Sequence, residues 1–239
     1  MCTISIVAHR RGVRMVCNRD ERRTRAAAWA PRERRVGRQS ALFPVDPQSG
    51  GTWVGVNRLG LIAALLNRSV DGGGRPASRL TSRGLIVPRL LASSSIDEAV
   101  QAVQSLPRDR FAPFRVVLTQ GGLYAAVTGG GGELAAITEL GVLGRPRVFS
   151  SSSLGDELVE TFRHRLFHDL LAASRGRPLA AQAALHRHQW ADRPEISVLM
   201  ERREARTVSR SQVDVDYPSG RVWLLYEPVA DAATWATAC

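Results

Sequence analysis

The sequence contains no lysine, so all 33 of its basic residues are arginine, and they leave a formal net charge of +11. This bias indicates the arginine-rich codon usage of a GC-rich bacterial genome more than it indicates a particular ligand. The three cysteines, Cys2, Cys17 and Cys239, do not form a disulfide framework. No hydrophobic run is long enough to span a bilayer, and the first residues alternate apolar with polar side chains, unlike a signal peptide. We therefore expect a cytoplasmic protein without an integral membrane segment.

Arginine is densest over residues 22–38, which we predict to be a loop between two hairpins. A solvated charged surface is the simplest interpretation of such a run. The alternative is a pocket mouth that attracts an anionic ligand through its carboxylate, phosphate or propionate group. Nucleic acid is not an expected partner, because aromatic residues are sparse there (only Trp29) and no nucleic-acid-binding fold is indicated.

A β-hairpin is predicted at the start of the chain, from β-branched, alternating residues over 3–7 and 13–18. Short hairpin loops pair residues whose numbers sum here to about 21 or 22. Cys2 then lies across from Arg19 or Asp20. A carboxylate at Asp20 is suited to hold the α-amine of Cys2, and a nearby guanidinium favours the thiolate.

Cys2 directly follows Met1, and methionine aminopeptidases remove Met1 when a small residue follows it. The mature chain would then begin with a cysteine that carries a thiol and a free α-amine on one carbon. Such an amine has a pKa of roughly 7.7–8.0, close enough to neutrality to act as a base toward its own thiol. A nucleophile activated by the N-terminal amine is an established catalytic arrangement.

A second hairpin is predicted from the glycine-rich segment 50–56 and the apolar run 61–66, which ends on Asn67. The chain has only three asparagines, and all lie in these two hairpins: Asn18, Asn57 and Asn67. Asn57 fits a turn. Asn67 follows a buried strand, where its amide is either a strand-end cap or an oxyanion donor for acyl transfer.

Together these segments resemble the NRDE family, which includes the transport and Golgi organisation proteins. The matching segments are Met1-Cys2-Thr3, Asn18-Arg19-Asp20-Glu21, Gly50-Gly51-Thr52-Trp53, Asn67-Arg68, Ser82-Arg83-Gly84-Leu85 and Arg206-Thr207-Val208-Ser209. The family is similar to the N-terminal-nucleophile (Ntn) hydrolases, among them choloylglycine hydrolases and penicillin V acylases. Compared with that wider group, Cys17 replaces an arginine, and the serines at 150–153 stand where a second asparagine is found.

The resemblance implies roles for individual residues. It makes Cys2 the nucleophile, Asp20 the partner of its amine and Asn67 the oxyanion donor, with Arg206 as a late catalytic arginine. We add Asn18 and Arg19 of the four-residue signature to the catalytic set. We expect substrate contacts from Trp53, Arg68 and Ser151. No metal or cofactor is expected, although two histidine pairs, at 164 and 168 and at 186 and 188, share the helical region.

The rest of the chain predicts a layered fold. Helices are expected over 96–106, 154–173 and 178–188. Strands are expected over 114–119, 123–128, 196–200, 207–215 and 221–226. With the two hairpins, this order indicates one α+β domain over residues 1–239. The resemblance implies a four-layer αββα Ntn-hydrolase-like sandwich of two antiparallel sheets flanked by helices.

Two classes of function remain open. The first is an N-terminal-cysteine amidohydrolase or acyltransferase that acts on a non-peptide amide or acyl group. The second is a non-catalytic protein that carries haem or an acyl-CoA-like lipid in the same pocket, with a haem site ligated by Cys2 as a further form of it. Turnover that depends on Cys2 would distinguish the two.

Overall fold

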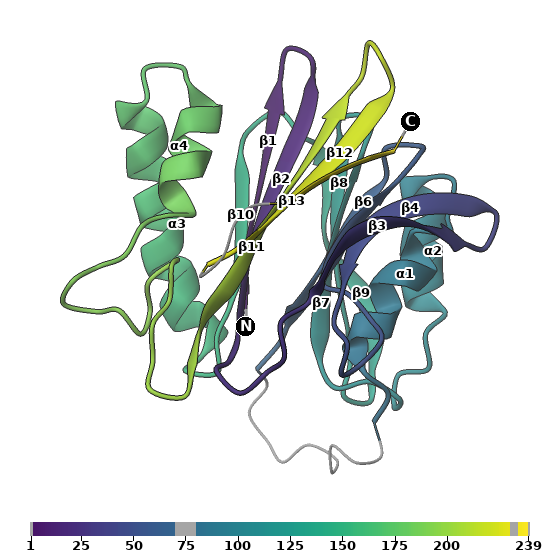
Figure 1. Ribbon diagram of the computed structural model, residues 1–239, viewed down its shortest axis with the longest axis horizontal. Helices are drawn as coiled ribbons and strands as arrows, with labels where there is room; N and C mark the ends of the chain where they lie inside the picture. The colour runs from purple at the N-terminus through teal and green to yellow at the C-terminus, as the bar shows by residue number, and fades with distance from the viewer. Residues whose placement is uncertain (1, 70–79, 230–233, 239) are drawn as a thin grey trace.

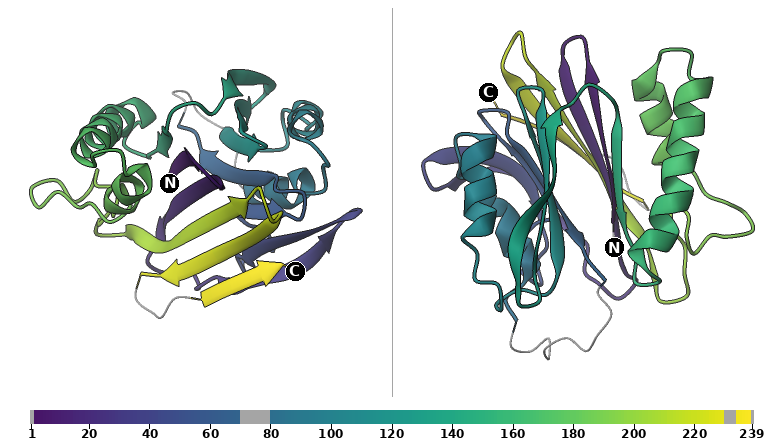
Figure 2. Two further views of the ribbon diagram at one scale, coloured as in Figure 1. Left: turned by 90° about the horizontal axis from the view of Figure 1, so that it is seen from above. Right: turned by 180° about the vertical axis from the view of Figure 1, so that it is seen from behind.

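The computed structural model describes residues 2–69, 80–229 and 234–238. Within these residues, two antiparallel sheets face each other, and a pair of helices covers the outer face of each (Figures 1 and 2). The predicted four-layer αββα sandwich is thereby confirmed. No described helix is long and apolar enough to cross a membrane.

The first sheet has the strand order β10-β1-β2-β11-β12-β13. Its strands are β1 (Cys2–His9), β2 (Gly12–Arg22), β10 (Arg147–Ser151), β11 (Ala205–Asp216), β12 (Arg221–Pro228) and β13 (Thr234–Ala238). The second sheet has the order β3-β4-β5-β6-β7-β8-β9. Its strands are β3 (Trp29–Val36), β4 (Gln39–Val45), β5 (Val54–Asn57), β6 (Ile62–Asn67), β7 (Phe114–Gln120), β8 (Leu123–Gly130) and β9 (Glu133–Val142).

The helices come from two separate parts of the chain. After the short 3-10 turn η2 (Arg83–Leu85), α1 (Ile86–Leu90) and α2 (Ile96–Gln104) pack on the second sheet. The helices α3 (Asp156–Ala173) and α4 (Pro178–Leu185) pack on the first sheet. Ser95 caps α2 by accepting a hydrogen bond from the Glu98 amide at 3.1 Å, as its position before the apolar run predicts.

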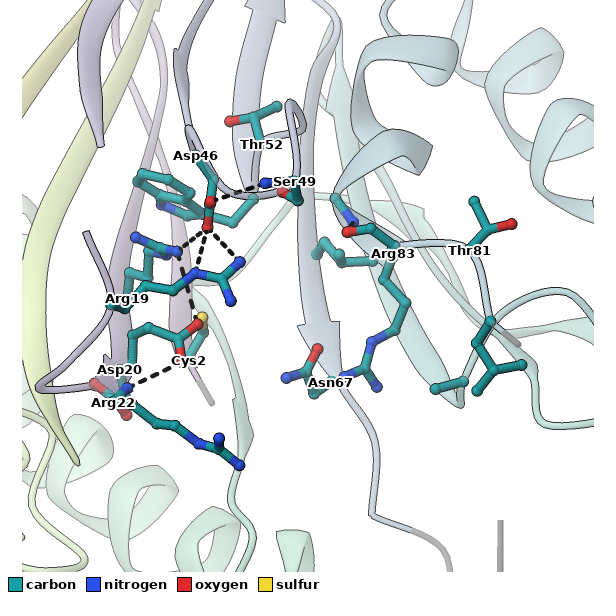
Figure 3. A pocket seen from close by; sticks show the side chains of 18 residues that line it. Cys2, Arg19, Asp20, Arg22, Asp46, Ser49, Thr52, Asn67, Thr81 and Arg83 are labelled. Carbon is teal, nitrogen blue, oxygen red and sulfur yellow. Dashed lines mark hydrogen bonds and ion pairs between the residues drawn. The ribbon is translucent and has the colours of Figure 1, made fainter. Parts of the chain in front are cut away.

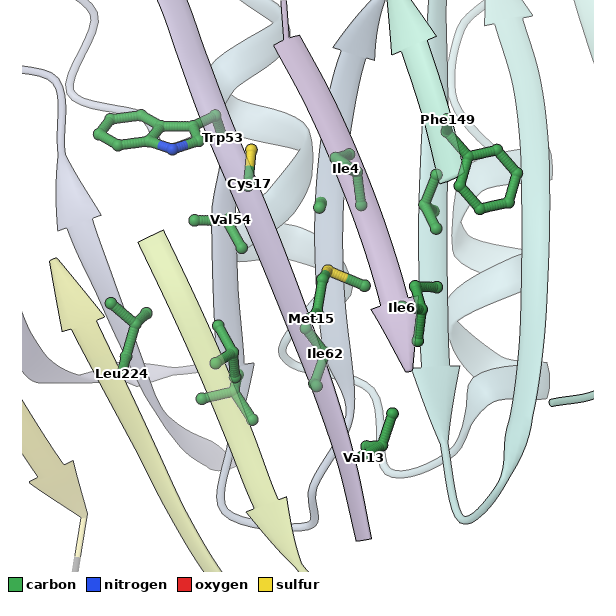
Figure 4. Close-up of a cluster of buried hydrophobic side chains, with 14 of the residues drawn as sticks. Ile4, Ile6, Val13, Met15, Cys17, Trp53, Val54, Ile62, Phe149 and Leu224 are labelled. Carbon is green, nitrogen blue, oxygen red and sulfur yellow. The ribbon is translucent and has the colours of Figure 1, made fainter. Parts of the chain in front are cut away.

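Three apolar clusters separate the four layers. The largest lies between the sheets and includes Ile4, Met15, Val54 and Ile62, all fully buried (Figure 4). The second lies under α1 and α2, and the third lies under α3 and α4. Because strand side chains alternate between faces, β1 and β2 contribute to the middle layer with one set of residues and to the helical layer with the other.

The prediction that residues 22–38 form a loop is wrong for residues 29–36. Nearly half of this stretch, residues 29–36, is β3, which pairs with β4 through residues such as Arg34, opposite Ala41, and Arg35, opposite Ser40. Four consecutive charged residues of β3 are exposed, so the alternation that marks a half-buried strand is missing. A charged strand at the edge of a sheet also protects that edge from pairing with other chains.

The strand predicted over residues 196–200 is also absent. The carbonyls of this segment accept hydrogen bonds from buried side chains in place of a neighbouring strand. Arg163 donates from Nε to Ile196 at 3.1 Å and from Nη2 to Ser197 at 2.7 Å. Asn18 donates from Nδ2 to Val198 at 2.9 Å. Nothing in the apolar pattern of the segment itself distinguishes these two arrangements.

Candidate active site

A pocket of about 550 Å³ opens where the N-terminal end of β1 meets the C-terminal ends of β2 and β6 (Figure 3). Cys2 and residues 19–22 line it from the first sheet. Asn67 and the segments 46–53 and 80–84 line it from the second. A volume in this range is typical of small-molecule sites. The two hairpins singled out in the sequence therefore build one cavity.

Cys2 is buried in the pocket wall, with 6% of its surface exposed. It pairs with Arg19, which confirms the predicted hairpin register. Cys17, on the neighbouring strand, pairs with Ile4. Its thiol hydrogen-bonds the Cys2 sulfur, and this contact lowers the pKa of Cys2 to about 7 against the opposing effect of burial. The same contact raises the pKa of Cys17, so the thiolate forms first at Cys2.

The backbone nitrogen of Cys2 donates to Ser151 Oγ on the adjacent strand β10, at 3.2 Å. This nitrogen becomes the α-amine when Met1 is removed. Ser151 is buried and does not line the pocket, so it lies behind Cys2, away from the cavity.

Asp20 lines the pocket and is buried, with its Oδ1 accepting a hydrogen bond from Thr207 Oγ1 at 2.7 Å. Burial raises the pKa of Asp20, although the positive charge of Arg163 and the Thr207 hydrogen bond act in the opposite direction. Arg163 is itself fully buried in α3 and donates from Nη1 to Thr3 Oγ1 at 2.7 Å. The arginine on α3 thus supplies a fixed positive charge behind Asp20 and Cys2.

Arg19 and Trp53 form the wall beside Cys2. The Arg19 guanidinium lies over the Trp53 ring, 4.4 Å from its centroid, and forms an ion pair with Asp46. Arg25 binds the same Asp46 oxygen, from Nε at 3.0 Å and from Nη2 at 2.8 Å. Burial raises the pKa of Asp46, but the hydrogen bond from Arg25 and the charges of both arginines outweigh it and hold that pKa below its usual range. The carboxylate of Asp46 thereby compensates the positive charges of two pocket arginines, Arg19 and Arg25.

Asn67 is half-buried at the end of β6, the strand position predicted for it, and lines the pocket. Figure 3 shows its amide on the side of the cavity opposite Arg19 and Asp20. Its neighbour Arg68 donates its backbone N–H to the Pro113 carbonyl at 3.1 Å. Cys2 and Asn67 therefore line opposite sides of one cavity.

Arg83 also lines the pocket, and in the sequence it stands out only as part of the segment Ser82-Arg83-Gly84-Leu85. Its Nη1 donates to the same Pro113 carbonyl as the Arg68 amide, at 2.7 Å, which places the guanidinium close to Asn67. Burial lowers the pKa of Arg83, while the negative charges of Cys2 and Glu21 act to raise it. No local sequence signal gives this position, because it depends on the packing of two distant glycines.

These glycines are Gly51 and Gly84. A Cβ on Gly51 would lie 2.3 Å from the Gly84 carbonyl carbon, so the two backbones can touch only because a side chain is missing. The Thr52 amide also donates to the Gly84 carbonyl at 2.9 Å. This contact fixes the segment that carries Arg83 against the loop that carries Trp53.

The side chain of Asn18 lies in a buried hydrogen-bond network beneath α4 and does not line the pocket. Because its Nδ2 donates to the carbonyls of His186 and Val198, its Oδ1 accepts from Nδ1 of His186 at 2.9 Å. The other ring nitrogen, Nε2, then accepts from the Ser5 hydroxyl at 2.7 Å. Gln182 donates to the same Ser5 oxygen at 2.9 Å. The asparagine of the signature thus links the β1–β2 hairpin to the helical layer.

Two further residues expected at the site also lie outside the pocket lining. Arg206 is half-buried on β11, where its backbone pairs with Glu21 of β2. Arg68 is half-buried, and its Nη1 lies 3.4 Å from Oε2 of Glu133. In the described structure, the pocket therefore brings together Cys2 with four of the other residues expected at the site, namely Arg19, Asp20, Trp53 and Asn67.

Solved structures of Ntn hydrolases share this fold. Penicillin V acylase from Agrobacterium tumefaciens aligns over 99% of this chain and 86% of its own, with 14% identity and a TM-score of 0.61. A mutant of conjugated bile acid hydrolase from Clostridium perfringens aligns over 99% and 92%, with 14% identity and a TM-score of 0.57. The N-acylethanolamine-hydrolyzing acid amidase orthologue of Caenorhabditis elegans aligns over 88% and 92%, with 11% identity and a TM-score of 0.58.

At such low identity these similarities show the fold alone. No curated protein matches the chain in sequence. A family model does match, and it covers residues 1–155, more than half of the chain and most of the pocket described above. The chain therefore belongs to the Transport and Golgi organisation 2 family.

Proposed function

We propose that this protein is an N-terminal-cysteine amidohydrolase or acyltransferase that acts on a non-peptide amide or acyl group. The observation that carries the proposal is the environment of Cys2: its thiol lines an open pocket, its pKa is held at about 7, and its backbone nitrogen is bound to Ser151. The hydrolase-like fold and its acylase and amidase neighbours support the same chemistry.

The proposed reaction begins after Met1 has been removed. The α-amine of Cys2 takes the thiol proton, and the thiolate attacks the carbonyl carbon of the substrate. Asn67 donates a hydrogen bond to the oxyanion that forms. Collapse of the tetrahedral intermediate breaks the carbon–nitrogen bond, and the leaving amine takes the proton from the α-ammonium group. A thioester with Cys2 remains.

Water or an acceptor amine resolves this thioester. The α-amine of Cys2 removes a proton from the incoming nucleophile, which attacks the thioester carbonyl at the position that Asn67 stabilises. The Cys2 sulfur leaves and recovers its proton from the α-ammonium group. Asp20 and Ser151 hold the amine throughout, as the partners that fix its orientation.

The test is turnover of a panel of acyl-amides, thioesters and lactams by the wild type and by the variants Cys2→Ala and Asn67→Ala. Cys2→Ala should abolish turnover. Asn67→Ala should lower kcat by about 100-fold or more with little change in KM, because its hydrogen bond strengthens in the transition state. Thermal unfolding of each variant checks that the fold is intact. Turnover that survives Cys2→Ala would contradict the proposal.

The second candidate is a carrier that holds haem or an acyl-CoA-like lipid in the same pocket. The observation in its favour is the wall formed by Arg19 over Trp53, since a cation on an aromatic ring offers a flat surface for a conjugated or anionic ligand. A carrier would bind haem or acyl-CoA stoichiometrically and turn over no member of the panel. Its affinity would change in Cys2→Ala only if sulfur touches the ligand.

A further inference from the structure

The arginines that line the Cys2 pocket differ in how their charges are compensated. Arg19 and Arg25 share the carboxylate of Asp46. Arg22 is exposed to solvent at the rim. Arg83 is half-buried, and among the described residues no carboxylate lies within ion-pair distance of it. One pocket cation is therefore partly withdrawn from water, and the described part of the chain gives it no carboxylate partner of its own.

Arg83 is also held in a defined orientation. Its hydrogen bond to the Pro113 carbonyl fixes Nη1, and the close backbone contact of Gly51 with Gly84 anchors the segment that carries it. Figure 3 shows its side chain extending into the cavity toward Asn67. A guanidinium has five N–H donors in a planar fork, so one bond to a carbonyl leaves further donors for a ligand. Withdrawing this charge from water costs free energy that an anionic ligand would recover.

We propose that Arg83 is the anion-binding residue of the Cys2 pocket and that the natural ligand presents a carboxylate or phosphate to it. This inference deepens the proposed function, because it names the substrate class of the same site. The anionic group lies on the Asn67 side of the reacting carbonyl, where the guanidinium binds it in the bidentate manner typical of arginine with carboxylate and phosphate. Arg83 is thereby a specificity-determining residue.

The test uses two alkylating reagents that differ in one group. Iodoacetate carries a carboxylate where iodoacetamide carries a neutral amide of nearly the same shape. In both reactions the Cys2 thiolate displaces iodide and forms a thioether. The ratio of the two rate constants cancels any change in the pKa of the thiol, since both reagents react with the same thiolate. Peptide mapping confines the measurement to Cys2, and glutathione gives the ratio for a thiol without a binding site.

In the wild type, the iodoacetate-to-iodoacetamide ratio should exceed that of glutathione by about tenfold, the effect expected of one charge-assisted hydrogen-bonded contact. The reaction with iodoacetate should also saturate. Arg83→Gln should return the ratio to that of glutathione, and Arg83→Lys should retain part of it. The matched control is Arg22→Gln, which removes the same charge from the rim and should leave the ratio unchanged.

Three results would overturn the inference. One is a wild-type ratio equal to that of glutathione. Another is an equal fall of the ratio in Arg22→Gln and Arg83→Gln, which would show a general positive field and not a bound anion. The third is a loss of rate with both reagents in Arg83→Gln at an unchanged ratio. That result would show that Arg83 stabilises the Cys2 thiolate and does not bind the carboxylate of the reagent. Acetate and inorganic phosphate are then compared as inhibitors of the alkylation of Cys2. Stronger inhibition by acetate indicates a carboxylate ligand, and stronger inhibition by phosphate indicates a phosphate ligand.

The alkylation test does not measure substrate turnover, so its result is independent of whether the proposed reaction takes place. An amidase that shows no preference for iodoacetate would contradict the anion site alone. An inactive protein with an Arg83-dependent preference would contradict the proposed reaction alone and favour a carrier of anionic ligands.

Discussion

Cys2 and Ser151 face each other across β1 and β10, and the Cys2 backbone nitrogen donates to Ser151 Oγ at 3.2 Å. The serine is buried behind Cys2, away from the pocket. In the proposed mechanism this nitrogen is the base, so a residue expected to touch the substrate becomes one that orients the amine. The difference between these two roles is measurable.

Ser151→Ala should slow acylation of Cys2 by about two- to tenfold, the effect of one lost neutral hydrogen bond. The loss should appear in kcat and not in KM, because the substrate does not touch this hydroxyl. The control is Ser150→Ala. Ser150 is equally buried on the same strand, and its hydroxyl has no hydrogen-bond partner among the described residues. A rise in KM with unchanged kcat in Ser151→Ala would contradict this role, because it would show that Ser151 contacts the substrate.

The Cys17 thiol should set the pH at which Cys2 reacts. Alkylation of Cys2 by iodoacetamide should rise with pH and reach half its maximum near pH 7, because the Cys17 hydrogen bond lowers the pKa of Cys2 to about 7. Cys17→Ala removes that donor and should move the midpoint toward the ordinary thiol range, near pH 8.5. The rate constant measured from pH 5 to pH 10 checks this. An unchanged midpoint in Cys17→Ala would show that another group stabilises the thiolate.

His186 should make the fold sensitive to acid. Burial lowers the pKa of His186 to about 3, below the value of about 6.5 expected in the unfolded chain. The unfolded state therefore binds the proton first as pH falls below about 6.5, and the free energy of unfolding decreases by up to about 1.4 kcal/mol per pH unit from this group.

Urea denaturation between pH 7 and pH 5 measures this loss. His186→Gln should be less stable than the wild type at pH 7, because it disturbs the contacts with Ser5 and Asn18. Its free energy of unfolding should nevertheless fall less steeply over the same pH range. An equal slope in both proteins would assign the acid sensitivity to other groups.

The contact between Gly51 and Gly84 should be essential for the pocket wall. In Gly51→Ala the new Cβ would meet the Gly84 backbone at 2.3 Å, so the segment that carries Arg83 must move. We expect a loss of about 1–3 kcal/mol in stability, typical of overpacking, together with a lower iodoacetate-to-iodoacetamide ratio at Cys2. Gly144→Ala is the control, because nothing lies within 4 Å of a Cβ at that position. A Gly51→Ala variant with the stability and ratio of the wild type would contradict this account.

The sequence predicts the part of the site that local patterns determine. The hairpin turn fixes the register that places Cys2 opposite Arg19, and the apolar run of β6 places Asn67 at the strand end. Arg83 could not be found in this way, because its position follows from a contact between two glycines far apart in sequence. Strand alternation also explains why Asn18 does not line the pocket. Its side chain lies on the opposite face of β2 from that of Arg19 and therefore contacts His186.

Charged and exposed segments were the least predictable part of the fold. Both β3 and β9 lie at edges of the second sheet and expose most of their residues, so neither shows the alternation of apolar and polar side chains that reveals a strand. Their pairing is imposed by β4 and β8, which are well buried. The carbonyls of residues 196–198 are likewise satisfied by Arg163 and Asn18, which sequence patterns do not bring together.

The most direct test of the central claim is the intact mass of the purified protein before and after treatment with a carbonyl electrophile, followed by peptide mapping. If Cys2 is an N-terminal nucleophile, Met1 is absent, one adduct forms, and the adduct lies on Cys2. Cys2→Ala, expressed in the same way, should gain no adduct at the same reagent concentration. Quantitative retention of Met1, or an adduct on Cys17 with Cys2 unmodified, would contradict the account, because the amine would then not be on the reacting residue.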